Sequence, residues 1–192
     1  MCGRLNVTSD PLTQIVSDAL GINFTTETNT DLRPTQKFAA IGSTNDHLQQ
    51  LNVSWGIKPQ WAKKLLINAQ SETVAEKPTF RKAFAQHRCV IPCSGWYEWS
   101  GANGGAKTKY LFQGMDGQPV YMAGIWYEPE VDGELPKLVT LTTKPTEECA
   151  QYHHRMPLVL PEEAVSDWVL ASADQVVPLL ALGGPKVDVK LA

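Results

Sequence analysis

The sequence predicts an α+β fold, a single domain over residues 1–192 in which a mainly antiparallel, barrel-like sheet is flanked by short helices. Three observations support this prediction. Short β-like runs crowd the middle of the chain, helical patterns lie towards both ends, and no long alternation of strand and helix indicates parallel βαβ units. A chain of 192 residues with 43% apolar residues can bury one sizeable core without disulfides.

The first helix is predicted at residues 9–20. Ser9 or Asp10 can serve as the N-cap, and Pro11 fits the first turn because its fixed φ suits that position. Gly21 is expected to end the helix, since glycine adopts the left-handed conformation found there. The apolar face of this helix consists of Leu12, Ile15, Val16 and Ala19.

β-like runs fill the centre of the chain, and glycine and asparagine punctuate them. The clearest turn lies at residues 102–106. Phe80 and Phe84, four residues apart, predict one face of a short helix. Two further helices are predicted at 161–170 and 174–182. The predicted strands are 37–41, 48–55, 88–92, 96–99, 109–113, 119–127, 137–143 and 186–191.

Charge is distributed unevenly, although the chain as a whole carries only −3. Residues 58–88 hold seven basic side chains and two acidic ones, which gives that segment a local charge of +5. Residues 128–148 hold six acidic side chains against two lysines. This polarity suits one surface that faces an anion such as nucleic acid, and the alternative is two ordinary solvated faces.

Several classes of protein are disfavoured by the same sequence. No apolar run approaches 20 residues and no signal-peptide pattern opens the chain, so we expect no membrane span and a cytoplasmic location. Four cysteines are too few for a disulfide framework, and the spacing of Cys89 and Cys93 does not match a zinc site. We therefore expect core cysteines, no metal and no organic cofactor.

The N-terminus offers a specific chemistry. Met1 is followed by Cys2 and Gly3, so removal of Met1 is expected to leave Cys2 with a free α-amine beside its thiol. Such an aminothiol condenses with an aldehyde: the amine forms an imine, and the thiol closes a thiazolidine ring. Alternatively the thiol acts as a nucleophile with the amine as its base, or the cysteine stands there by chance.

Three polar residues are candidates for moving protons in either reaction. Asn68 follows an apolar pair, Glu98 stands among aromatic residues in a strand pattern, and His153 borders an apolar strand. Burial among rings is expected to raise the pKa of Glu98 towards the range of a general acid. Each residue also has a plain structural interpretation, as a turn asparagine, a surface glutamate or a core histidine. If His153 and His154 lie on a strand, they point to opposite faces.

Taken together, the short sequence motifs of this chain make it resemble the SOS response-associated peptidase (SRAP) family of abasic-site processing proteins. Each motif is weak alone, but the ordered set is specific and spans most of residues 1–170. The matching elements are Met1-Cys2-Gly3-Arg4, Trp55-Gly56 with Pro59 and Trp61, Asn68-Ala69 with Ser71-Glu72-Thr73, Phe80-Arg81, Arg88-Cys89-Val90-Ile91-Pro92, Ser94-Gly95-Trp96-Tyr97-Glu98-Trp99, Ala123-Gly124-Ile125-Trp126 and His153-His154-Arg155-Met156-Pro157.

The resemblance implies a function on DNA. The family binds single-stranded DNA at abasic sites, including junctions with duplex, and its processed N-terminal cysteine forms a thiazolidine crosslink with the ring-opened sugar. By the motif match, Cys2 is the nucleophile and Asn68 orients it. Glu98 acts as the acid/base, and His153 assists ring opening and crosslink reversal. Self-removal of Met1 accounts for the name peptidase.

Contacts to DNA are expected from both the resemblance and the residues themselves. Cationic and aromatic side chains suit a phosphate backbone and unpaired bases, and the Trp96/Trp99 region is a further candidate for stacking. We expect a monomer that associates with the nucleoid when it is bound to DNA. The residues assigned to DNA contact are Arg4, Trp61, Arg81 and Arg155.

Two segments depart from the family pattern. Gln70 stands where relatives commonly carry an arginine that contacts phosphate, and Asp31 with Arg33 stands in a segment that usually reads Asn-x-Ala-Pro. Two rival functions remain. A glutamine amidotransferase also uses an N-terminal cysteine, but this chain lacks its ordered Asn-Gly-Asp-like element. A non-catalytic single-stranded DNA-binding module would bind DNA without reacting.

Overall fold

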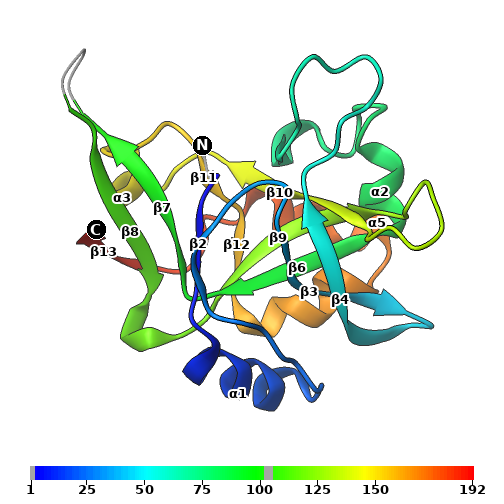
Figure 1. Ribbon diagram of the computed structural model, residues 1–192, viewed down its shortest axis with the longest axis horizontal. Coiled ribbons are helices and arrows are strands. Elements are labelled where there is room, and N and C mark those ends of the chain that lie inside the picture. Colours follow the sequence, from blue (N-terminus) through cyan, green and yellow to red (C-terminus); the bar gives the residue numbers. More distant parts are fainter. Residues whose placement is uncertain (1–2, 102–105) are drawn as a thin grey trace.

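Two β-sheets with short helices around them form the fold, which was obtained as a computed structural model that describes residues 3–101 and 106–192 (Figure 1). The predicted turn at 102–106 and Cys2 therefore fall wholly or largely outside the described residues. Pairing within the sheets is mainly antiparallel, as predicted. No helix in the described ranges is long and apolar enough to cross a membrane.

The larger sheet closes into a barrel. Its strands pair around a complete ring because β10 bonds to β4 on one side and to β9 on the other. The β10–β4 pairing is parallel, and the rest of the ring is antiparallel. The barrel-like sheet predicted from the sequence is thereby confirmed. In ring order the strands are β10 (Lys137–Thr143), β4 (His47–Trp55), β3 (Lys37–Thr44), β6 (Arg88–Cys93) and β9 (Val120–Tyr127).

Three very short strands attach to this barrel. β5 (Asn68–Gln70) pairs in parallel with β10, β11 (Met156–Pro157) pairs antiparallel with β10, and β12 (Val159–Leu160) pairs with β9. β5 was not predicted, because three residues are too few to show an alternating pattern. One apolar strand was expected next to His153, and the structure divides it into β11 and β12. They carry or border the polar residues of the candidate site.

The smaller sheet is entirely antiparallel and holds the N-terminal segment. A single residue, Ser94, separates β6 of the barrel from β7. Gly95 opens β7 so close to β8 that an added Cβ would lie 2.2 Å from the carbonyl oxygen of Phe112, so only glycine fits there. In sheet order the strands are β13 (Val187–Leu191), β8 (Thr108–Gly114), β7 (Gly95–Ser100), β1 (Leu5–Val7) and β2 (Asn29–Leu32).

The helices are short and lie on the outside of the sheets (Figure 1). The longest, α1 (Ser9–Leu20), keeps an extended backbone at Asp10, so its regular turns begin at Pro11. Gly21 ends it with φ of 64°, as predicted. The others are α2 (Arg81–Gln86), α3 (Glu147–Ala150), α4 (Val165–Leu170) and α5 (Ala173–Val176).

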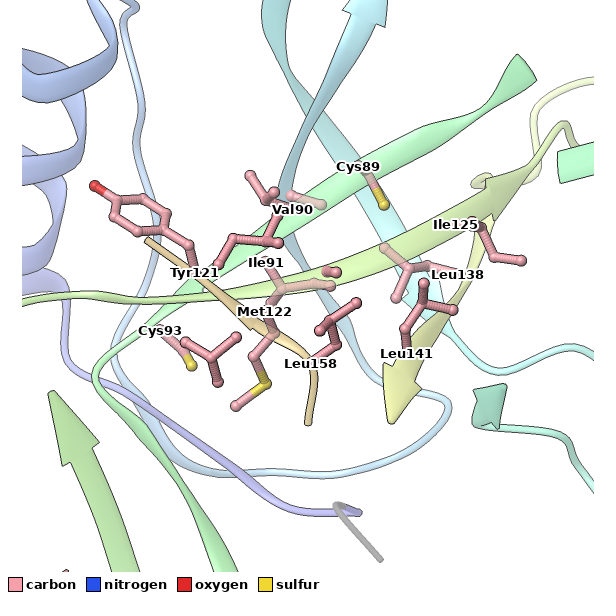
Figure 2. Packing of buried hydrophobic residues seen from close by; sticks show 14 of the residues in the cluster. Cys89, Val90, Ile91, Cys93, Tyr121, Met122, Ile125, Leu138, Leu141 and Leu158 are labelled. Atoms are coloured by element: carbon pink, nitrogen blue, oxygen red, sulfur yellow. The ribbon is translucent and has the colours of Figure 1, made fainter. Parts of the chain in front are cut away.

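The hydrophobic core lies in and around the barrel. Figure 2 shows Ile91 and Met122 packed beside Leu158, with Leu138 and Leu141 of β10 next to them. All of β6 is buried, because helix α4 covers the face that does not point into the barrel. The core cysteines were predicted correctly: Cys89, Cys93 and Cys149 are buried free thiols.

Arg88 corrects the charge argument made from the sequence. Its side chain is buried and donates from Nε to the carbonyl of Trp168 (2.7 Å) and from Nη1 to that of Phe84 (2.7 Å). Nη2 donates to the carbonyl of Ala171. Arg88 therefore ties the C-terminal ends of α2 and α4 together, and its charge does not contribute to a DNA-binding surface.

Candidate functional site

The two edges of β10 hold two of the candidate segments. Thr140 and Thr142 lie two residues apart, so their side chains point to the same side of the strand, and both are buried. β5 runs in parallel along β10, with Thr140 opposite Asn68 and Thr142 opposite Gln70. β11 pairs on the other side, with Thr142 opposite Pro157. The Asn68 segment and the His153 segment thus meet on β10.

Asn68 is oriented by this arrangement. The hydroxyl of Thr140 donates a hydrogen bond to Oδ1 of Asn68, and it also lies 3.2 Å from the carbonyl of Ile67. Because Oδ1 accepts from Thr140, the amide nitrogen Nδ2 is the end of the side chain that can donate to a reacting group. Asn68 is a strand residue and not a turn residue.

Arg155 is clamped by groups on both sides. Its Nη1 and Nη2 donate to the two carboxylate oxygens of Glu72 at 2.6 and 2.8 Å, and Nη2 also donates to the carbonyl of Thr142 at 2.5 Å. The side chain of Arg155 is 12% exposed. Hydrogen bonding from Arg155 lowers the pKa of Glu72, so the pair is ionised at neutral pH. Arg155 therefore links its own loop to the segment after β5.

His153 has a partner ready for either protonation state. The backbone N–H of Arg155 lies 3.0 Å from Nδ1 and can donate to it when the ring carries its proton on Nε2. The carbonyl of Arg155 lies 3.0 Å from the same Nδ1 and can accept from it when the ring is protonated. Burial lowers the pKa of His153, which favours the neutral form at pH 7. The ring can exchange a proton without turning.

The expectation that His153 and His154 point to opposite faces is wrong. Both lie in the loop before β11, and their rings stack with centroids 4.3 Å apart. A strand would separate the two rings, whereas this irregular backbone lets consecutive side chains lie together. His154 is exposed and His153 is half-buried.

Glu98 lies on the buried face of β7, next to the His153 loop. It is 3% exposed, and burial raises its pKa above the ordinary value for a glutamate. Its cross-strand neighbour on β8 is Tyr110, whose ring packs against Tyr152 at 4.7 Å. Since Tyr152 precedes His153, the face of the smaller sheet that carries Glu98 packs against the segment that leads to His153. The predicted rise in the pKa of Glu98 is supported.

Trp96 shares this buried face with Glu98, as strand alternation predicted. The expectation that it stacks on bases is wrong, because Trp96 is fully buried and stacks on Phe112 with centroids 4.9 Å apart. Trp99 is half-buried on the opposite face of β7 and stays a candidate for contact with DNA.

Arg4 lies at the edge of this region, where an ion pair holds it. It pairs with Asp31 of β2, which also accepts from Nε of Arg33 at 2.9 Å. The Arg4 guanidinium lies over the ring of Trp99, 5.5 Å from its centroid. Hydrogen bonds from Arg4 and Arg33 lower the pKa of Asp31. The triad carries a net positive charge, so the acidic residue does not cancel the cationic surface.

Cys2 lies outside the described residues, but the chain that follows it is placed. The carbonyl of Arg4 accepts a hydrogen bond from the backbone N–H of Tyr97 (2.9 Å), the residue before Glu98. The start of β1 therefore runs beside Glu98. In the sequence, Cys2 stands two residues before Arg4.

The other predicted DNA contacts lie further along the surface. Trp61 is 67% exposed in the loop between β4 and β5 and borders a cavity of about 420 Å³. Arg81 is exposed at the start of α2. Both lie on other elements than Asn68, Glu98 and His153, so they are candidates for contact with the DNA that flanks the reacting sugar.

Sequence reasoning missed the residues that hold the site together. Thr140 orients Asn68, Glu72 and Thr142 hold Arg155, and Asp31 holds Arg4. Lys109 was also missed: its Nζ lies 3.7 Å from the ring centroid of Tyr97 on the outer face of β7. Glu72 stood within a quoted motif, but nothing in a sequence shows which arginine it would bind.

Comparison with known families gives a consistent result. The family model described as SOS response associated peptidase (SRAP) matches residues 1–188. The abasic site processing protein YoqW of Bacillus subtilis is 30% identical over 180 residues, covering 88% of this chain and 80% of the relative. The abasic site processing protein YedK of Escherichia coli is 32% identical over 141 residues, covering 72% and 63%.

Solved structures share the fold along the whole chain. A phage-related protein from Bordetella bronchiseptica superposes with a TM-score of 0.85 at 21% identity, covering all of this chain and 94% of that one. A protein from Bacteroides thetaiotaomicron gives a TM-score of 0.76 at 23% identity, covering 99% and 91%. At these identities the likeness concerns the fold alone.

Proposed function

Because this chain belongs to the SOS response associated peptidase (SRAP) family, we propose that it processes abasic sites in DNA and captures them through Cys2. Relatives at about 30% identity are named abasic site processing proteins, which supports DNA with abasic sites as the substrate. What supports the proposal is that the segment following Cys2 pairs beside the buried carboxyl group of Glu98. The segments of Asn68 and His153 both lie along β10.

The reaction consumes the ring-opened aldehyde of the sugar. Met1 is first removed by hydrolysis, which frees the α-amine of Cys2. The amine then adds to the aldehyde carbon, and the resulting carbinolamine loses one water to form an imine. Finally the Cys2 thiol adds across the C=N bond, its proton passing to nitrogen, and closes a thiazolidine. The product contains both reactants less one water.

Each candidate residue has a role that suits its environment. Glu98, whose pKa burial raises, donates a proton to the leaving hydroxyl of the carbinolamine. His153, which is neutral because burial lowers its pKa, accepts the hydroxyl proton when the sugar ring opens. Asn68 donates from Nδ2 to orient Cys2. The same thiol, acting on the preceding peptide bond, accounts for the self-processing peptidase activity.

Single-stranded DNA, including its junctions with duplex, is the proposed partner. Arg4 and Arg33 present guanidinium groups to phosphates near the reacting sugar, and Arg81 extends this surface. Trp61 and Trp99 offer rings for unpaired bases. These contacts carry little sequence information, so binding is expected to be nearly independent of base sequence.

A denaturing gel tests this proposal. The protein is mixed with a single-stranded oligonucleotide that carries one abasic site, heated and separated. We expect a heat-stable shifted band that Cys2→Ala abolishes while non-covalent binding to an uncleavable abasic analogue is kept. Cys93→Ala is the matched control, because burial raises the pKa of that thiol to about 12 and leaves it unreactive. Binding without any band from processed protein would indicate a DNA-binding module only.

A further inference from the structure

We propose that Glu72 is a positioning residue for the crosslinking reaction: through Arg155 it fixes the imidazole of His153 relative to Asn68. The inference rests on the proposed function. It concerns the ion pair between the segment after β5 and the loop before β11, which join the two sides of the site. Arg155 was predicted to contact DNA, and its geometry assigns it a structural task in addition.

The ion pair between Glu72 and Arg155 has a well-defined geometry. Both terminal nitrogens of Arg155 are engaged, one with each oxygen of Glu72 at 2.6 and 2.8 Å, and Nη2 also reaches the carbonyl of Thr142. A planar guanidinium that binds a carboxylate through two parallel hydrogen bonds has little freedom to rotate. A phosphate would have to displace Glu72 before it could take the same two donors.

The position of the Arg155 side chain affects the His153 ring through the backbone of Arg155. The amide nitrogen and the carbonyl oxygen of Arg155 each lie 3.0 Å from Nδ1 of His153. Any shift of Arg155 therefore moves both groups that set the tautomer and the direction of the imidazole. The connection is only two residues long, so it transmits displacement directly.

The segment of Asn68 and the loop of His153 are both bound to β10. Thr142 binds Arg155, and Thr140, on the same face of the strand, binds Asn68. Glu72 lies just beyond Gln70, the last residue of β5. Without the carboxylate, the His153 loop loses its bond to the segment after β5 and keeps the bonds of Thr142 and of the β11 pairing to β10. The position of the His153 imidazole relative to the Asn68 amide is then less tightly fixed.

This arrangement separates binding from chemistry. Glu72 and Arg155 cancel each other's charge, so Glu72→Gln adds positive charge at the site and is not expected to weaken DNA binding. A displaced imidazole, however, slows proton transfer, since small misplacements of reacting groups cost large factors in rate. A slower maximal rate with unchanged or tighter binding is thus the mark of a positioning role.

The kinetic experiment measures single-turnover crosslinking against protein concentration, with abasic oligonucleotide limiting. For Glu72→Gln we expect the maximal rate to fall about tenfold or more, while the half-saturating concentration stays within about twofold or decreases. Glu72→Asp, which keeps the charge, should recover part of the rate. Glu76→Gln is the matched control, because Glu76 is an exposed glutamate in the same segment. A maximal rate near wild type for Glu72→Gln would overturn the proposal.

A second readout needs neither DNA nor activity. Nitrogen-15 spectra of the imidazole in wild-type protein should show His153 as the Nε2–H tautomer, with Nδ1 unprotonated. In Glu72→Gln the two nitrogens should move towards averaged positions, while Glu76→Gln leaves them unchanged. An unaltered His153 spectrum in Glu72→Gln would refute the clamp even if crosslinking works. Failure of wild-type protein to crosslink would instead refute the proposed function.

Discussion

Glu98 shows how one residue is tuned by its surroundings. The carboxyl group lies on a strand face that it shares with Trp96, beside a ring contact between Tyr110 and Tyr152. Little water reaches it, so the charged form is disfavoured and its pKa rises. A carboxyl group whose pKa is raised keeps its proton to higher pH, and this favours a role as a general acid.

Glu98→Gln is expected to abolish measurable crosslinking and to stabilise the fold at neutral pH. Because the pKa of Glu98 is higher in the folded state than in the unfolded one, wild-type stability declines as pH rises from the unfolded pKa through the folded pKa. Glutamine does not titrate. Thermal unfolding of both proteins between pH 4 and pH 8 should show an advantage for the variant that grows with pH. An advantage that shrinks with pH would contradict the buried-acid assignment.

His153 is expected to set the acidic limit of the reaction. Burial lowers its pKa, so the base is present at pH 7, and crosslinking should decline only below the ordinary histidine value of about 6.5. The measurement is the crosslinking rate between pH 4.5 and pH 8. In His153→Gln the overall rate should fall and this acidic limb should disappear. The same limb in the variant would assign it to another group.

Among the structural elements, the loop between β4 and β5 carries Trp61 out from the barrel. Its exposure makes it available to unpaired bases, and base stacking on one aromatic ring contributes about 1–3 kcal/mol. Trp61→Ala should weaken binding to single-stranded DNA by about tenfold or more without changing the melting temperature. Met115→Ala, which removes an exposed apolar side chain elsewhere, is the control. Equal affinities for the two variants would remove Trp61 from the DNA path.

Arg88 stabilises helices α2 and α4 by donating hydrogen bonds to carbonyl groups at their C-terminal ends. Arg88→Met leaves the carbonyls of Phe84, Trp168 and Ala171 without their donor. Unpaired buried carbonyls are costly, so we expect a loss of about 3 kcal/mol in the free energy of unfolding. Urea unfolding measures this loss, and DNA affinity at low temperature should stay at the wild-type level. A weaker affinity of the folded variant for DNA would show that Arg88 contributes to DNA binding.

The elements differ in how well the sequence predicted them. The helix at 9–20 was readable because Pro11 and Gly21 mark its ends, and long strands were readable from their apolar runs. β5 was not, since three residues carry no period, and the apolar strand expected next to His153 is divided into β11 and β12. The residues of the proposed site also differ in how well the sequence indicated them. Asn68, Glu98 and His153 stood out by type, but Glu72, Thr140 and Thr142 become partners only through the register of strands around β10.

At the scale of the whole molecule, the proposed site takes residues from both sheets. The barrel contributes Asn68 and the loop of His153, and the smaller sheet contributes Glu98 and the segment that leads from Cys2. Closure of the barrel through β10 fixes one side, and the β1–β7 pairing fixes the other. An overall charge of −3 with a locally basic segment suits a protein that binds DNA on one face only.

The central claim is that Cys2 captures the aldehyde through both its amine and its thiol. Intact mass spectrometry of the protein–oligonucleotide adduct, with and without borohydride, tests it most directly. We predict the mass of the protein without Met1 plus the oligonucleotide less one water, unchanged by borohydride because a thiazolidine has no C=N bond to reduce. An adduct that gains two hydrogens on reduction would show an imine without ring closure. An adduct that forms equally in Cys2→Ala would contradict the account.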